Sequence, residues 1–221
     1  MTRLAKRSTV LALLLAQLGL SACVPVAVVG GATAGAIVAA DRRSVEQQGR
    51  DADIERLVER RLKENFGERV HVNANVYDGT LLLTGEVPTA ELKVEVDALV
   101  KLTPNVRRTI DETRIQKLSE ARWRANDALI TANVKTRFGQ SGKFDVSLIK
   151  VITESNTVYL MGRVTQKEAD EAIEIARASQ GVQRVVNVLD VMSAEAINAG
   201  RDARPATPAA TPAAAHVPVA K

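Results

Sequence analysis

One segment of the chain occurs twice, and this internal repeat limits the possible folds more than any other feature of the sequence. Residues 78–87 (DGTLLLTGEV) align with residues 155–164 (SNTVYLMGRV), which lie 77 positions later in the chain. Two further matches are separated by 76 positions: an apolar stripe that begins at Ile54 and again at Ile130, and a Val-x-Arg motif that begins at Val106 and again at Val182. Agreement at three separate places is not expected by chance, and it predicts two copies of one small domain.

Each copy carries the residue pattern of a helix, two strands, a second helix and a third strand. In the first copy, apolar residues recur every four positions on a segment whose other faces are charged, which predicts an amphipathic helix. These residues are Ile54, Val58, Leu62 and Phe66. Residues 70–76 alternate apolar and polar side chains, as a strand with one wet face does. Asp78-Gly79 then predicts the hairpin turn into a second strand, residues 81–87.

The second copy repeats this order of elements. Thr165 and Glu168 form a predicted capping box at the start of its second helix, which presents small apolar residues: Ala169, Ala172, Ile173 and Ala176. The closing strands are expected at about residues 108–115 and 185–192. Three strands with two helices on one face predict an α+β domain of two layers for each copy.

Gly85 and Gly162 occupy equivalent strand positions in the two copies. A glycine inside a strand often marks a place where another part of the chain approaches closely. We expect that a side chain at either position would clash with a packed helix. Neither glycine belongs to a phosphate-binding loop, because no glycine cluster follows it at a strand-to-helix junction.

The N-terminus has the pattern of a bacterial lipoprotein signal peptide. Three basic residues precede an apolar stretch, residues 10–20, which is too short to span a bilayer. It ends in Leu20-Ser21-Ala22-Cys23, which resembles the lipobox whose cysteine receives a diacylglycerol. Cys23 is the only cysteine, so no internal disulfide can form. A buried core cysteine is the alternative, and its place after the apolar stretch favours lipidation.

Five segments are therefore predicted along the chain. Residues 1–22 are the signal peptide, and residues 23–49 contain the lipidated cysteine and a Gly/Ala/Val-rich tether. The tether is expected at the bilayer surface, with a transmembrane helix as the alternative at the lower length limit. The two domains follow at residues 50–116 and 117–192. Residues 193–221 are rich in Ala and Pro, which predicts a disordered tail.

Charge and composition exclude several functions. The chain has 30 basic and 26 acidic residues, but three of the basic ones precede Cys23, so the mature chain is nearly neutral. With only 3% aromatic residues, it lacks the basic, aromatic surface of a nucleic-acid-binding protein. His71 and His216 suggest neither a metal pair nor a Ser/His/Asp set. We expect no enzyme, cofactor, metal or small-molecule substrate, and a monomeric protein.

The repeat resembles the BON domain, a small module of bacterial envelope proteins. The resemblance rests on Leu-x-Leu-x-Gly-x-Val at residues 81–87, Val-x-Leu-x-Gly-x-Val at residues 158–164, and the later Val106 and Gly181-Val182. The lipobox, the tether, Asp41-x-Arg43-Ser44-Val45 and two such copies together resemble dual-BON outer-membrane lipoproteins, over about residues 23–192.

That resemblance implies a location and a ligand. It implies an outer-membrane lipoprotein facing the periplasm, since Val24 and not Asp follows the cysteine. It implies that the second domain binds anionic phospholipid, and that the protein supports outer-membrane integrity and gathers at the division site. The membrane contact would involve the first helix of that domain, about residues 122–139. A family tryptophan in Asn-Asp-x-Trp-Ile-Thr is replaced here by Leu129.

The residues themselves give this face partial support. Leu129 lies about 100° around the helix from the core-facing Ile130, so it is expected at the surface. With it we group the basic residues Arg124, Lys135 and Arg137 as a hypothetical phospholipid-binding face. Trp123 belongs to the same group if it sits among lipid headgroups. Trp123, however, lies seven residues before the core-facing Ile130, which places the two on nearly the same side of the helix. Helical phase therefore favours packing of Trp123 against the core.

A protein-binding adaptor is the alternative function. An exposed sheet edge or helix face would then recruit envelope machinery, and the two roles could coexist.

Overall fold

The computed structural model describes residues 41–202. Cys23, the predicted signal peptide, most of the tether and the end of the Ala/Pro-rich segment lie outside the described residues. Residues 40–221 form one compact unit. All the apolar clusters of the described residues lie within this unit, so we expect it to fold on its own as a fragment.

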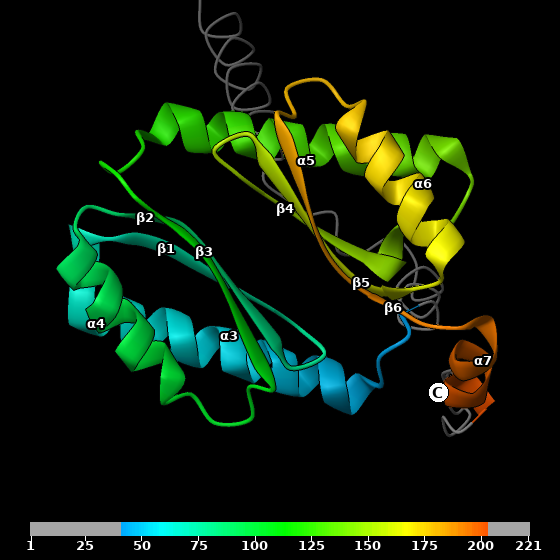
Figure 1. The fold of residues 1–221 in the computed structure, drawn as a ribbon, viewed down its shortest axis with the longest axis horizontal. Helices are drawn as coiled ribbons and strands as arrows, with labels where there is room; N and C mark the ends of the chain where they lie inside the picture. Colours follow the sequence, from blue (N-terminus) through cyan, green and yellow to red (C-terminus); the bar gives the residue numbers. More distant parts are fainter. Residues whose placement is uncertain (1–40, 203–221) are drawn as a thin grey trace, which may run out of the picture. The chain divides into compact units, whose positions relative to one another are not determined.

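The elements follow the predicted order in each copy (Figure 1). The first copy contains α3 (Val45–Phe66), η3 (Gly67–Arg69), β1 (His71–Tyr77), β2 (Thr80–Val87), α4 (Ala90–Lys101) and β3 (Arg108–Ile115). The second contains α5 (Ala121–Ser141), η4 (Val146–Leu148), β4 (Ile149–Glu154), β5 (Thr157–Val164), α6 (Gln166–Arg177) and β6 (Arg184–Val191). A final helix, α7, spans Ala194–Asp202.

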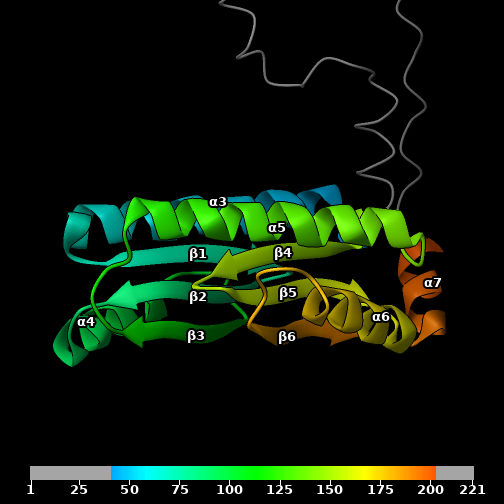
Figure 2. The same cartoon turned by 90° about the horizontal axis from the view of Figure 1, so that it is seen from above.

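The two copies share one sheet topology. The strand orders are β1-β2-β3 and β4-β5-β6, each with an antiparallel hairpin followed by a parallel pair. The parallel pair requires a crossover, which α4 and α6 provide. In Figures 1 and 2, α3 and α4 lie on one face of the first sheet, and α5 and α6 on one face of the second. The predicted α+β fold is confirmed.

Each copy has its own apolar core between its sheet and its helices. In the first copy the stripe of α3 packs with Leu81, Leu83 and Val87 of β2. In the second, Ile130, Val134 and Phe138 of α5 pack with the alanines of α6. The capping box predicted at Thr165 and Glu168 is present and begins α6. The amphipathic periodicities therefore identified the core residues correctly.

The second face of each sheet is also buried, which the two-layer prediction did not include. Leu82 of β2 and Tyr159 and Met161 of β5 belong to one apolar cluster with Tyr77 and Val188. Every residue of β2 from Leu81 to Val87 is buried as a result. Polar contacts between the copies surround this cluster, including the Arg184–Glu112 ion pair at 2.8 Å and Arg114 Nη2 donating to Thr157 Oγ1 at 2.8 Å. The two copies therefore share a core.

A buried aspartate in the first helix of each copy holds the hairpin turn. Asp51 accepts hydrogen bonds from the backbone N–H groups of Asp78 and Gly79, at 2.7 and 2.9 Å. Asp127 does the same for Ser155 and Asn156, at 2.9 Å each. All four turn residues have positive φ, as a type I′ hairpin turn requires. Asp51 and Asp127 are 76 positions apart, the same separation as the apolar stripes of the two helices, so the sequence repeat already showed them to be equivalent.

The explanation predicted for Gly85 and Gly162 is wrong. A Cβ atom on Gly85 would lie 2.0 Å from the backbone oxygen of His71, and one on Gly162 would lie 2.4 Å from that of Leu148. The close neighbour is thus backbone, at the start of β1 for Gly85 and at the end of η4, just before β4, for Gly162, and not a packed α-helix. Gly181 is the glycine that faces a helix, because its Cβ would lie 2.9 Å from the Ile130 side chain of α5.

The tail predicted to be disordered from residue 193 instead begins with a helix. Residues Ala194–Asp202 form α7, and Ser193 Oγ accepts a hydrogen bond from the N–H of Ala196 at 3.1 Å. Ile197 is buried, with 7% of its surface exposed. The Ala/Pro-rich composition begins after this helix, and averaging over the whole tail concealed it.

Removing the turn-holding carboxylate should destabilise the fold. Asp127→Ala leaves two backbone N–H groups without their acceptor, so we expect the free energy of unfolding to fall by roughly 2–4 kcal/mol. Asp51→Ala should cost more, because Asp51 also pairs with Arg43 at 2.8 Å. Urea denaturation of residues 40–221 measures both, with the exposed Glu174→Ala as a control near zero. A loss below about 1 kcal/mol for both variants would contradict this role.

Candidate membrane-binding surface

The first helix of the second copy, α5, presents a long exposed surface. Its buried residues, Asp127, Ile130, Val134 and Phe138, follow one stripe, and Gly142 ends the helix in the left-handed conformation. Figure 2 shows α5 running along the outside of the β4-β5-β6 sheet. None of the helices within residues 41–202 has the length and apolar character needed to cross a membrane.

The solvent-facing charges of α5 are all basic. Its only acidic residue, Asp127, is buried and holds the hairpin turn. The basic residues are Arg122, Arg124, Lys135 and Arg137. In contrast, α3 carries acidic and basic residues in nearly equal numbers. The two helices thus share their buried stripe and differ in surface charge.

The difference is concentrated at equivalent positions of the two helices. At the offset of 76 set by α3 and α5, Leu129 corresponds to Asp53. Lys135 corresponds to Glu59 and Arg122 to Glu46. The duplicated helix has therefore exchanged three acidic positions for one apolar and two basic ones.

Leu129 is exposed over 70% of its surface, as expected from helical phase. Its nearest neighbours on the helix surface, three and four residues away, are Ala125, Asn126, Ala132 and Asn133. Arg122 lies on the same side of the helix, two turns before Leu129. Lys135 and Arg124 lie more than about 100° away around the axis. The helix therefore does not bring the five predicted residues into one patch, and Arg122 is a basic neighbour of Leu129 that the sequence analysis did not select.

The basic side chains of α5 differ in their contacts. Arg124 donates to the backbone oxygen of Ser119 at 2.6 Å, and half-buried Arg137 donates to that of Ala178. Arg122 lies 5.1 Å from the Trp123 ring and 3.2 Å from Glu120. Among residues 41–202, Lys135 has no hydrogen-bond or ion-pair partner. Lys135 is thus the cation most available to an external anion, while Arg122 is exposed but also pairs with Glu120.

The core packing favoured for Trp123 is wrong. Trp123 has 54% of its surface exposed and stacks with Arg122 instead. It lies in the first turn of α5, where residues 121–125 are all exposed.

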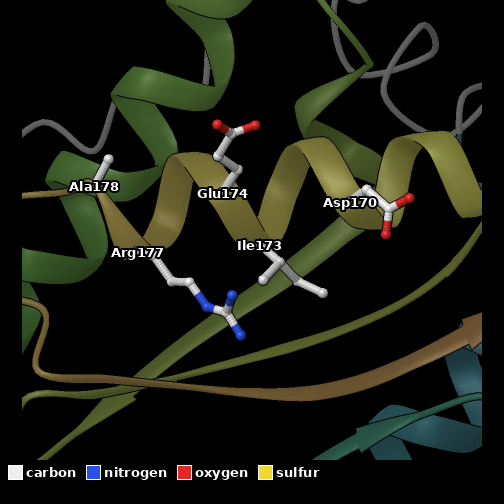
Figure 3. Close-up of a pocket in the computed structure, with 5 residues that line it drawn as sticks. All are labelled: Asp170, Ile173, Glu174, Arg177 and Ala178. Carbon is white, nitrogen blue, oxygen red and sulfur yellow. The ribbon is translucent and has the colours of Figure 1, made fainter.

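A shallow hollow beside α6 does not suit an anionic ligand. It is lined by Asp170, Ile173, Glu174, Arg177 and Ala178, which project from one stretch of the helix (Figure 3). Two carboxylates face a single guanidinium there, so the local charge is negative. Phospholipid headgroups of the same sign would be repelled.

A second group of polar residues lies between the two copies. Ligand atoms of His71, Glu86 and Glu154 all lie within 4.8 Å of one another. Glu86 accepts from Ser119 Oγ and Ser155 Oγ at 3.1 and 3.2 Å. The sequence predicts no metal site, because its two histidines, His71 and His216, suggest no metal pair. Only the packing of the copies brings the three together.

Burial changes the proton affinities of this cluster. Burial, together with the negative charges of Glu86 and Asp127, raises the pKa of Glu154 to about 7, although a hydrogen bond from Asn73 acts in the opposite direction. Burial lowers the pKa of His71, partly offset by Glu86.

The segment before α3 contacts both copies. Arg43 pairs with Asp41 and Asp51 and lies 3.9 Å over the Tyr77 ring. Arg42 pairs with Glu168 of α6 at 2.7 Å and donates to the backbone oxygen of Arg163 at 2.8 Å. The Asp41-x-Arg43 motif thus fastens the end of the tether to the folded unit.

Comparison with known proteins identifies the repeat. The BON domain family matches residues 50–117 and 126–193. The chain belongs to the BON-domain family. Among curated relatives, the outer membrane lipoprotein DolP of Haemophilus influenzae is 35% identical over 176 residues, which cover 78% of this chain and 90% of DolP. This similarity places the BON-domain protein among DolP-like lipoproteins of the outer membrane.

Other similarities of the BON-domain protein are weaker. A 21 kDa hemolysin of Actinobacillus pleuropneumoniae is 28% identical over 144 residues, covering 64% of this chain and 74% of the hemolysin. A solved structure of CdsD, a structural protein of the type III secretion system of Chlamydia trachomatis, is 14% identical and covers 69% of this chain and 99% of its own. Its TM-score of 0.27 is too low to relate the two arrangements.

The raised pKa of Glu154 predicts a pH-dependent stability of the BON-domain protein. Protonated Glu154 stabilises the folded state fully below its ordinary pKa of 4.5, and this contribution is lost as pH rises through about 7. Between about pH 5.5 and pH 8, we expect wild type to lose on the order of 1–2 kcal/mol more than Glu154→Gln. Urea denaturation of residues 40–221 in EDTA, for wild type and Glu154→Gln at both pH values, measures this difference. Equal pH slopes for the two proteins would contradict the prediction.

Proposed function

We propose that this protein is a non-catalytic lipoprotein, anchored in the outer membrane by lipidated Cys23 and facing the periplasm. In this proposal its second BON domain binds anionic phospholipid through α5 and supports outer-membrane integrity, including at the division site. The observation that carries the proposal is the basic outer surface of α5, with Leu129 exposed over 70% of its surface.

Charge supplies the attraction. Each basic residue near an anionic membrane contributes about 1 kcal/mol. Arg122 and Lys135 are exposed, and the only carboxylate of α5 faces inward. A first helical turn normally favours acidic residues, yet α5 has none there and carries Arg122 and Arg124. The positive end of the helix dipole adds to their potential.

Apolar side chains supply insertion. Leu129 and Trp123 are both largely exposed, and each would gain from partial burial at a headgroup boundary. They occupy different sides of the helix, so both can insert together only if α5 lies with a broad face on the bilayer. Leu129 with Arg122 forms the smaller and better defined contact.

The first BON domain is not proposed to bind anionic lipid. The positions of Leu129 and Lys135 are held there by Asp53 and Glu59, which an anionic surface would repel. Two membrane signals then have separate tasks. Lipidation gives attachment, and α5 gives selectivity for membrane regions rich in anionic lipid.

Vesicle binding tests the α5 contact. Residues 40–221 should sediment with phosphatidylglycerol vesicles and not with phosphatidylcholine vesicles. Lys135→Glu and Arg122→Glu should each weaken binding at least about fivefold, because a favourable charge becomes repulsive. Arg60→Glu on exposed α3 is the matched control and should change binding little. Equal binding to both vesicle types, or equal losses for control and test variants, would overturn the proposal and favour the protein-binding adaptor.

The anchor has its own test. Cys23→Ala removes the only thiol, so the full-length protein should carry no lipid, should be absent from the outer-membrane fraction, and should accumulate as precursor that keeps its signal peptide. Membrane fractionation with metabolic labelling by a palmitate analogue measures the first two consequences. A labelled Cys23→Ala protein, or an unlabelled wild type, would show that Cys23 is not the lipidated residue.

A further inference from the structure

The cluster of His71, Glu86 and Glu154 carries buried negative charge that lacks a basic partner. Glu86 is fully buried and Glu154 is 6% exposed. Within residues 41–202, neither carboxylate forms an ion pair with a lysine or arginine. His71 Nε2 lies 3.7 Å from Glu154 Oε1, and the nearby Arg124 acts on His71 only through space while it donates to the backbone oxygen of Ser119. Two carboxylates that are buried together without a cation are costly.

The opposite end of the interface shows how the fold balances such charge elsewhere. By the alignment of the repeats, Glu86 corresponds to Arg163, which lies 3.9 Å from Asp78. Arg42 and Arg43 also contribute guanidinium groups at that end. In the described structure, no arginine or lysine forms an ion pair with Glu86 or Glu154. Carboxylates without an arginine or lysine ion-pair partner therefore occur at the Glu86 and Glu154 end of the interface between the two copies, and not at the Arg163 end.

The donor set has the composition and spacing of a metal site. One imidazole nitrogen and two carboxylates lie within 4.8 Å of one another, and small side-chain rotations would bring them to the separations around a tetrahedral ion. Asn73 Nδ2 donates to Glu154 Oε2 at 2.8 Å, and Ser119 and Ser155 donate to Glu86. Such outer partners orient metal ligands.

A buried hydroxyl beside the cluster independently indicates a missing polar partner. Thr84 is fully buried and pairs with Asn73 across the β1–β2 ladder. Its Oγ1 is directed toward Glu154 without reaching hydrogen-bond geometry, so it has no hydrogen-bond partner. A water completing the coordination of an ion held by three protein ligands would supply that partner.

We propose that His71, Glu86 and Glu154 bind one divalent transition-metal ion, with Zn²⁺ as the probe, and that this ion joins the two BON domains. His71 and Glu86 come from the first domain and Glu154 from the second. The imidazole donor favours Zn²⁺ over Mg²⁺ and Ca²⁺, which prefer oxygen ligands. The His71 side chain, 25% exposed, leaves a path from solvent. This inference is independent of the proposed lipid binding.

Isothermal titration of Zn²⁺ into untagged residues 40–221 tests the site. We expect one ion per chain with a Kd below roughly 100 µM, weakened at least about 10-fold by His71→Gln and by Glu154→Gln. Glu154→Gln also removes a buried charge, so it should fold, and circular dichroism checks this. His71 is partly exposed, so His71→Gln provides a second variant if Glu154→Gln does not fold.

Matched controls separate this site from incidental binding. His216→Gln removes the other histidine, and Glu95→Gln removes an exposed carboxylate of α4, so neither should change the affinity. Zn²⁺ should raise the Tm of wild type and not that of Glu154→Gln, and millimolar Mg²⁺ should not displace it. A weaker Kd than stated, an affinity unchanged in His71→Gln and Glu154→Gln, or an affinity lost in His216→Gln would overturn the proposal.

Discussion

Tyr77, Leu82, Tyr159, Met161 and Val188 bury the second face of both sheets, and the remaining structure depends on this shared cluster. A small sheet covered by helices on one side normally leaves its other side to water. Here each domain covers the other. Full burial of a large apolar side chain contributes roughly 1.5–3 kcal/mol, so the cluster is a substantial part of the stability of both domains. It also explains why every residue of β2 from Leu81 to Val87 is buried.

The same packing encloses polar groups that an isolated domain would leave in water. Glu86 alternates with core residues along β2 and would face solvent if the second domain were absent. In the complete unit it meets Glu154 and His71, while the opposite end of the interface places Arg163 near Asp78. Burial of charge at one end is thus a direct consequence of joining two similar sheets, and it gives that end chemical properties that neither domain has alone.

Duplication kept the framework and changed the surface. Both first helices use the same stripe to cover their sheets and the same buried aspartate to hold the hairpin turn. Their solvent faces have diverged, so that α3 is mixed in charge and α5 is basic outside. This separation is physically simple, because exposed helix positions contribute little to folding and can change without loss of the core. The proposed membrane contact of the second domain would use this difference in surface charge.

The sequence alone determined the repeat, the element order, the core residues and the BON resemblance, because these follow from local periodicities of 2 and 3.6 and from motifs in short segments. It also placed Leu129 at the surface correctly, since helical phase fixes which side a residue faces. Helical phase failed for Trp123, which lies in the exposed first turn of α5. Averaged composition failed for α7, whose nine residues precede the Ala/Pro-rich part.

Only the tertiary structure decided the shared cluster, the close backbone neighbours of Gly85 and Gly162, and the meeting of His71, Glu86 and Glu154. Each depends on which strand or domain lies beside a given residue, and periodicity within one segment carries no such information. Glu86 and Glu154 belong to different domains and have no common local pattern. Their proximity arises from the packing of one sheet against another, and the energy of that packing is a property of both surfaces together.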